Sequence, residues 1–310
     1  MAKLSKPHAG SLQFWPRKRA ENLIPRVNWD PVKGDGILGF IAYKVGMATA
    51  IVKDTSDKSM TLNKKVFIPV TILEAPPMKV FSVRFYKNGK VLKDVIVSNE
   101  PSLKRYLRVP KQIGHLNAPE GFDNIHLIVY SLVSQTDVKK TPDLIEVAVG
   151  GANKLELTKS LINKELSFKE FFNHPMLDIR GVTKGKGFEG PVPRFGISLK
   201  SHKSEKGVRR PGSLAPWHPA RVTFRTPQAG QLGLFSRVHY NIRVIAQGNS
   251  KDKNINPGTG FSHYGKIQSD YILVKGSVQG PSKRAVLLTP SFRPTRFQSK
   301  KKYEFTELVI

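Results

Sequence analysis

Cysteine is absent from the 310 residues of this chain. Its absence excludes disulfide bonds, a catalytic thiolate and any zinc site that uses cysteine ligands. The N-terminal residues also lack the apolar segment of a secretory signal peptide. We therefore expect an intracellular, cytoplasmic protein whose fold depends on an ordinary hydrophobic core, for which 39% hydrophobic residues are sufficient.

Long apolar segments and catalytic signatures are missing too. A membrane-spanning helix needs about 18 or more consecutive apolar residues, and the sequence contains no such run, no amphipathic basic helix and no lipidation signal. It also contains no P-loop, no His-Glu-x-x-His zinc motif and no recognisable Ser-His-Asp arrangement. We expect no membrane partner, no enzymatic activity, no small-molecule substrate, no cofactor and no bound metal.

Acidic residues are few relative to basic ones. The chain has 51 Lys and Arg against 23 Asp and Glu, which gives a formal net charge of +28. A cationic excess of this size requires a polyanionic partner, and the release of counterions makes nucleic-acid phosphate the natural one. The affinity should therefore fall steeply as the salt concentration rises.

The charge is unevenly distributed along the chain. Residues 1–35 carry seven basic and three acidic side chains, residues 180–245 carry thirteen and two, and residues 281–302 carry seven and none. Residues 91–175 are nearly balanced, with eleven basic and ten acidic side chains. The balanced stretch is typical of an ordinary solvated surface, whereas the basic stretches are expected to face the nucleic acid.

Hydrophobic patterning indicates a mainly β protein with some helix. Runs rich in β-branched and aromatic residues predict strands at 37–52, 66–73, 80–86, 91–97, 125–133, 144–149, 271–275 and 285–288. The Asn88-Gly89 dipeptide between two of these runs supplies the positive φ values of a tight hairpin. Leucine and isoleucine spacing predicts a helix within 153–165. A second, short helix is expected to begin at Ser167, with Glu170 completing a capping box.

Two segments lack such patterning. Residues 1–35 are rich in proline and basic residues, which indicates an extended arm. Residues 182–233 are crowded with Gly, Pro, Lys and Arg and sustain no core-forming period, so they form an insertion between strands. A loop of this length can be ordered when phosphates, ribose hydroxyls and bases supply its missing partners.

Several motifs carry a resemblance to a known family. FWPRKRA at 14–20, GVTKGKGF at 181–188, WHPA at 217–220, FSHYG at 261–265 and YILVKG at 271–276 occur in the order and spacing of the universal L-three family of large-subunit ribosomal proteins. The match runs from the first residues to about Thr289. The RKR and WHPA elements resemble the archaeal and eukaryotic branch of the family, because bacterial members lack both.

The resemblance implies a fold and a function. The fold would be a six-stranded β-barrel like that of translation factors, with a helical and strand insertion and long basic extensions. The protein would be a structural constituent of the large subunit that binds rRNA and supports subunit assembly. A basic finger, at about residues 185–235, would enter the rRNA and approach the peptidyl transferase centre. Trp217 matches the tryptophan at the tip of the family's finger, close to the path of accommodating aminoacyl-tRNA. Ribosomal proteins L-fourteen and L-twenty-four-e would be candidate neighbours.

The same resemblance sets the expected domain boundaries. Residues 1–35 would form the arm, 36–90 the first part of the barrel, 91–177 a mixed α/β insertion, 178–290 the second part of the barrel with the finger at about 185–235, and 291–310 a C-terminal tail.

The candidate RNA-binding residues are basic side chains of the arm and the finger together with a few polar and aromatic ones. They are Arg17, Lys18, Arg19, Lys184, Lys186, Arg194, Lys203, Arg209, Arg210, Trp217, His218, Arg221, Arg225 and Gln231. Prolines on both sides of Trp217 and arginines around it favour stacking on unpaired bases over burial in the core. For His218, a base or phosphate contact and local packing both remain open, and the RKR run is either a phosphate contact or a solvated charge run.

Three alternatives to RNA binding are less favoured by the sequence. Residues 185–190 (GKGFEG) satisfy the Gly-x-Gly-x-x-Gly pattern of dinucleotide sites, but the prolines at 191 and 193 oppose the helix that such a site requires. The eight histidines show no metal-binding spacing. A basic architectural DNA-binding protein would share the charge and the salt dependence, but it would bind duplexes without preferring folded RNA.

Overall fold

The computed structural model describes residues 12–203 and 206–309, and it divides the chain into two compact units. We call residues Met1–Glu21 with Thr183–Ser236 the basic unit, and residues Asn22–Val182 with Arg237–Ile310 the body. The basic unit thus combines the first part of the predicted arm with the predicted finger. The rest of the predicted arm belongs to the body, where Trp29 and Val32 are buried in the core.

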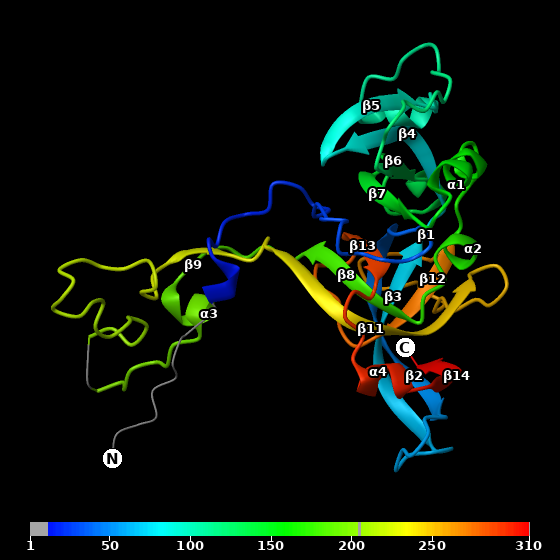
Figure 1. Ribbon diagram of the computed structural model, residues 1–310. Helices are drawn as coiled ribbons and strands as arrows, with labels where there is room; N and C mark the ends of the chain where they lie inside the picture. Colours follow the sequence, from blue (N-terminus) through cyan, green and yellow to red (C-terminus); the bar gives the residue numbers. More distant parts are fainter. Residues whose placement is uncertain (1–11, 204–205, 310) are drawn as a thin grey trace. The chain divides into compact units, whose positions relative to one another are not determined.

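The larger sheet of the body has seven strands (Figure 1). They are β2 (Phe40–Asp54), β3 (Lys65–Ala75), β8 (Met176–Val182), β11 (Ser236–Asn249), β12 (Asp270–Lys275), β13 (Ala285–Pro290) and β14 (Tyr303–Val309). Their order is β13-β8-β11-β12-β3-β2-β14, and β13 also pairs with β2. All six residues of β13 are buried because the strand is apolar on both faces.

The smaller sheet has five strands in the order β1-β7-β6-β4-β5. They are β1 (Gly36–Ile37), β4 (Met78–Lys87), β5 (Lys90–Ile96), β6 (Asn124–Ser131) and β7 (Leu144–Gly150). The hairpin between β4 and β5 is confirmed: Asn88 and Gly89 have φ values of 50° and 73°, as a two-residue turn of this kind requires. One continuous hydrophobic core includes side chains from both sheets.

Helices are few and short. The body contains α1 (Lys154–Leu161), α2 (Phe168–Phe171) and α4 (Arg296–Lys300), with 3-10 turns η2 (Pro101–Arg105) and η3 (Val133–Gln135). The helix predicted within 153–165 is confirmed, and so is the mainly β fold class. The predicted capping box is wrong, because the Ser167 side chain makes no cap hydrogen bond. No helix in the described part of the chain has the length and apolarity to cross a membrane.

Some elements depart from the sequence-based expectation. Strands β8, β11 and β14 were not predicted, because charged or polar residues interrupt their apolar ones, and in β8 one of these, Asp178, is itself fully buried. The segment 291–310, expected as a tail, contains α4 and β14, and β14 pairs with β2. A helix also follows the 185–190 motif: α3 (Pro191–Phe195) begins with proline, which the first helical turn tolerates because its N–H groups have no intrahelical acceptor.

Candidate nucleic-acid interface

The base of the basic unit is a two-stranded ribbon that joins the two ends of the insertion. Strand β9 (Gly187–Glu189) pairs antiparallel with β10 (Gly230–Leu232). Lys186 N donates to Leu232 O at 2.9 Å, and Thr183 N donates to Phe235 O at 3.0 Å. Gly233 has a φ of 73°, and a Cβ there would lie 2.1 Å from the Lys184 carbonyl oxygen, so the close approach of the two backbones requires glycine.

Arg194 binds the second strand of this ribbon from the side. Its Nε donates to the Gln231 carbonyl at 3.1 Å, and its Nη1 donates to the Gln228 carbonyl at 2.9 Å. Burial lowers the pKa of this guanidinium from its ordinary value. Gln231 is also used internally, since its Nε2 donates to the carbonyls of Leu232 and Gly233, both at 3.1 Å. Both side chains therefore order the finger base, and their contact with RNA stays a prediction.

Arg17 connects the N-terminal segment to the same base. Its Nη1 donates to the Arg194 carbonyl at 3.1 Å, and its guanidinium lies 4.2 Å from the centre of the Phe195 ring. Trp15 packs at 5.3 Å, edge to face, against Phe224. Ala20 N donates to Leu234 O at 2.7 Å. Sequence reasoning missed this packing because its partners lie far apart in the chain.

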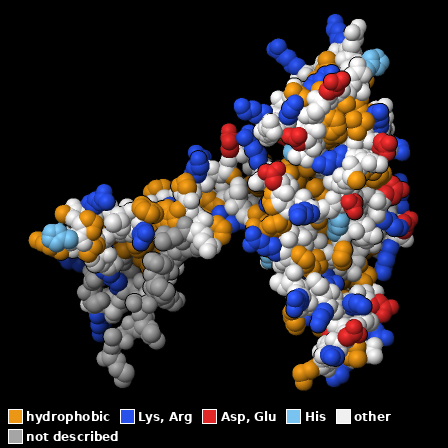
Figure 2. Space-filling model, in the orientation of Figure 1, with side chains coloured by type: hydrophobic (Ala, Val, Ile, Leu, Met, Phe, Trp, Pro, Cys, Tyr) orange, Lys and Arg blue, Asp and Glu red, His pale blue; other side chains and the backbone are white. Residues whose placement is uncertain are grey.

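The other predicted basic residues are exposed to solvent. They are Lys18, Arg19, Lys184, Lys186, Lys203, Arg209, Arg210, Arg221 and Arg225. The basic unit has fifteen Lys and Arg and three acidic residues in its sequence, against thirty-six and twenty in the larger body. In Figure 2, the visible face of the body mixes red and blue side chains, whereas blue and orange side chains predominate on the visible face of the basic unit. The structure thus presents a dense cationic surface.

Aromatic side chains are interleaved with these cations. Trp217 is 88% exposed, and the His218 ring packs against it edge to face at 6.4 Å. The surrounding loop is closed by the Thr226 hydroxyl, which donates to the Leu214 carbonyl at 2.8 Å. The alternative of a buried, core tryptophan is wrong for Trp217. Phe188 is 81% exposed and was not among the candidates, although its place directly after a Lys-Gly pair in the GKGF motif could have indicated it.

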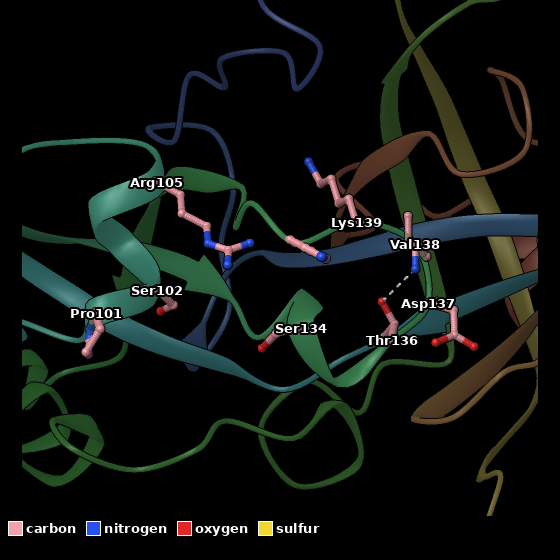
Figure 3. Close-up of a pocket in the computed structure, with 9 residues that line it drawn as sticks. Pro101, Ser102, Arg105, Ser134, Thr136, Asp137, Val138 and Lys139 are labelled. Atoms are coloured by element: carbon pink, nitrogen blue, oxygen red, sulfur yellow. Dashed lines mark hydrogen bonds between the residues drawn. The ribbon is translucent and has the colours of Figure 1, made fainter.

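A cavity of about 740 Å³ in the body is a second candidate for a binding site (Figure 3). Figure 3 shows Arg105 extending from η2 towards the loop that carries Lys139. Lys139 is already paired with Asp143 at 2.6 Å, and Asp137 also lines the cavity. No aromatic residue lines it. Within the described residues, no group of three His, Cys, Asp or Glu side chains could hold a metal ion.

Comparison with known proteins gives one consistent result. The sequence profile of the family described as Ribosomal protein L3 matches residues 1–97 and 117–308. The large ribosomal subunit protein uL3 of Methanocaldococcus jannaschii is 36% identical over 311 residues, which cover 94% of this chain and 92% of that protein. The uL3 of Methanococcus vannielii is 38% identical, with 94% and 93% covered. The uL3 of Archaeoglobus fulgidus is 38% identical, with 95% and 94% covered.

Proposed function

The chain belongs to the ribosomal protein L3 family, in its archaeal type, and on this premise we propose that its basic unit enters the rRNA and orders it near the peptidyl transferase centre and the path of aminoacyl-tRNA. As a member of this family, the chain is a structural constituent of the large ribosomal subunit that binds rRNA in the cytoplasm, and it is not an enzyme. Family membership does not favour the alternative of an architectural DNA-binding protein.

One observation carries the proposal about the basic unit. An 88% exposed indole at residue 217 leaves a large apolar area in water, and exposed arginines lie close to it in sequence. An exposed tryptophan among guanidinium groups is suited to stacking on an unpaired base, while the arginines neutralise the adjacent phosphates. The body supplies the scaffold, and RNA supplies the surface that covers the finger.

The body itself supports a more specific fold proposal. Six strands follow one another as neighbours in the larger sheet, in the order β2, β3, β12, β11, β8 and β13. The last of them, β13, pairs in turn with the first, β2, with Ala285 opposite Tyr43. We propose that these strands form the six-stranded barrel of the family, with β14 added at its margin. The predicted domain boundaries and the neighbours L-fourteen and L-twenty-four-e remain proposals that rest on the resemblance.

Replacing Trp217 by alanine tests the proposed function. At the contact itself, the change should remove about 1 to 3 kcal/mol of stacking. Mutant subunits should still assemble, because the many remaining contacts are unchanged. Accommodation of aminoacyl-tRNA and peptide-bond formation should change modestly, since the chemistry belongs to the RNA. Both rates would be measured on purified mutant subunits by rapid kinetics.

The melting temperature of the isolated protein provides the control for Trp217→Ala. It should stay at the wild-type value because the indole is exposed and supports no core. Ribosomal rates equal to wild type, combined with a markedly lower melting temperature, would contradict the proposal.

The arm offers a separate prediction, because its three adjacent basic residues have different surroundings. Lys18 and Arg19 are exposed, so replacing both by alanine should reduce the salt slope of rRNA binding by about 0.7 to 0.9 per lost phosphate contact.

Arg17→Ala should instead loosen the finger base, because it removes the hydrogen bond to Arg194 and the contact with Phe195. The free energy that stabilises the finger base should fall by about 1 to 2 kcal/mol.

Hydrogen exchange at the Lys186 amide, which is bonded across the base, distinguishes the two variants. Arg17→Ala should accelerate this exchange in the free protein, and the Lys18 and Arg19 double variant should not. Equal exchange in both variants would show that Arg17 does not stabilise the base.

A further inference from the structure

The C-terminal segment of the body folds against β11 and encloses a second candidate site. A cavity of about 350 Å³ lies between β11, the end of β12, α4 and the start of β14. Its lining residues are His239, Tyr240, Asn241, Ile242, Arg243, Lys275, Gly276, Phe297, Gln298, Lys301 and Tyr303. All of them belong to the body, and none is acidic. Figure 1 shows α4 and β14 in red below β11, and β14 pairs with β2.

Hydrogen bonds hold both walls of this cavity in place. Asp178 is fully buried, and its carboxylate accepts from Asn241 N at 2.7 Å and from Phe292 N at 3.0 Å. The Ser291 hydroxyl donates to the Asn241 side-chain oxygen at 2.5 Å. Arg243 donates to the carbonyls of Gln298 and Ser299. Contacts within the chain therefore hold the wall from β11 and the wall from the C-terminal segment together.

A local backbone feature presents an aromatic residue to the cavity. Asn241 has a φ of 58°, a left-handed conformation that asparagine tolerates better than most residues, in the middle of β11. Such a residue interrupts the alternation of the strand. His239 and Tyr240 are consequently both exposed although they are adjacent, and the exposed fraction of Tyr240 is 52%.

Two of the lysines that line the cavity lie close to aromatic rings that also line it. Phe297 is 70% exposed, and Lys301 Nζ lies 4.5 Å from the centre of its ring. Lys275 Nζ lies 4.9 Å from the centre of the Tyr303 ring. Residues 281–302 contain seven basic residues and no acidic one, so no carboxylate from this segment competes for these cations. The cavity at Arg105 differs, because it has an acidic lining residue and no aromatic one.

From this arrangement we infer that the cavity between β11 and the C-terminal segment binds an unpaired nucleotide of the rRNA. The base stacks on Phe297, and Lys301 and Lys275 neutralise the neighbouring phosphates. Aromatic rings combined with a cationic groove are the features that single-stranded nucleic acid requires. The inference rests on the proposed function, but it adds an RNA contact that is independent of the finger.

Replacing Phe297 by alanine in the full-length protein tests this site. The affinity for full-length large-subunit rRNA should fall about fivefold to 150-fold, the loss that corresponds to one stacked base. The salt slope should stay unchanged because no charge is removed. Lys301→Ala should instead reduce the slope by about 0.7 to 0.9. Phe67 is the matched control: it is 68% exposed on β3 and does not line this cavity, so Phe67→Ala should bind like wild type.

Photo-crosslinking identifies the occupant. With p-benzoylphenylalanine at position 297, assembled subunits should give a crosslink to rRNA at a nucleotide that lies outside the base-paired helices of the rRNA. A crosslink to a ribosomal protein, or one to duplex RNA, would overturn the inference. Equal affinity of Phe297→Ala and Phe67→Ala would also overturn it while leaving the proposed function intact. Failure of the wild-type protein to bind rRNA would instead refute the proposed function.

Discussion

Replacing Glu74 by alanine should lower the free energy of unfolding of the body by about 4 kcal/mol, because four donors would lose one buried acceptor. Glu74 lies on β3 and is fully buried. Its carboxylate accepts from Gln268 N at 2.8 Å, from Ser269 N at 3.0 Å and from the Ser269 hydroxyl at 3.0 Å. The Tyr264 hydroxyl is the fourth donor, and burial together with this carboxylate raises the Tyr264 pKa.

These contacts give the FSHYG motif a structural role in the body. Tyr264 belongs to this motif, in the loop that precedes β12. Glu74 holds the loop against β3, and Tyr271, which begins the YILVKG motif, pairs directly with Glu74 in the sheet. Two motifs that are separate in the sequence therefore meet at one buried carboxylate.

Denaturant unfolding would measure the effect of Glu74→Ala, with extrapolation to zero denaturant. A loss of this size is a large part of the 5 to 15 kcal/mol or so that stabilises a typical domain. Glu304→Ala is the control, because Glu304 is exposed on β14 and should change stability by less than about 0.5 kcal/mol. A loss below about 1 kcal/mol for Glu74→Ala would mean that water or neighbouring groups satisfy the four donors.

Replacing the four exposed arginines of the finger, Arg209, Arg210, Arg221 and Arg225, by alanine should have the largest effect on rRNA affinity. If each contacts one phosphate, the salt slope should fall in magnitude by about 2.8 to 3.6, since each contact contributes about 0.7 to 0.9. At low salt, the affinity should fall by orders of magnitude. Folding should be unaffected because all four side chains are exposed.

A variant with the same change in net charge isolates the role of position. Lys90, Lys104, Lys111 and Lys159 are exposed in the body, within or next to the stretch with balanced charge. Replacing these four by alanine should change the slope far less. Filter binding to large-subunit rRNA over a series of salt concentrations would compare the two variants. Equal slopes would show that net charge, and not the finger, determines binding.

Local signals in the sequence predicted the elements whose conformation depends on near neighbours. Asn88 and Gly89 specify their turn because few other residues adopt positive φ at low cost. The apolar runs of β2, β3 and β12 indicate strands because every residue of a buried strand must be apolar or paired. Strands β8 and β11 escaped prediction, since their basic residues resembled those of the insertion that they flank.

The sequence by itself determined the net charge, the polyanionic partner, the family and the places of the basic stretches, because charge and motif order are properties of the chain alone. Only the tertiary structure decided which basic side chains are exposed and which are used in contacts within the protein. Arg17 and Arg194, which lie 177 residues apart, hold the finger base together, and Phe297 and Lys301 share a cavity with residues 239–243 of β11. Such partners are chosen by long-range packing, which brings distant residues together and withdraws some charges from solvent while leaving others exposed.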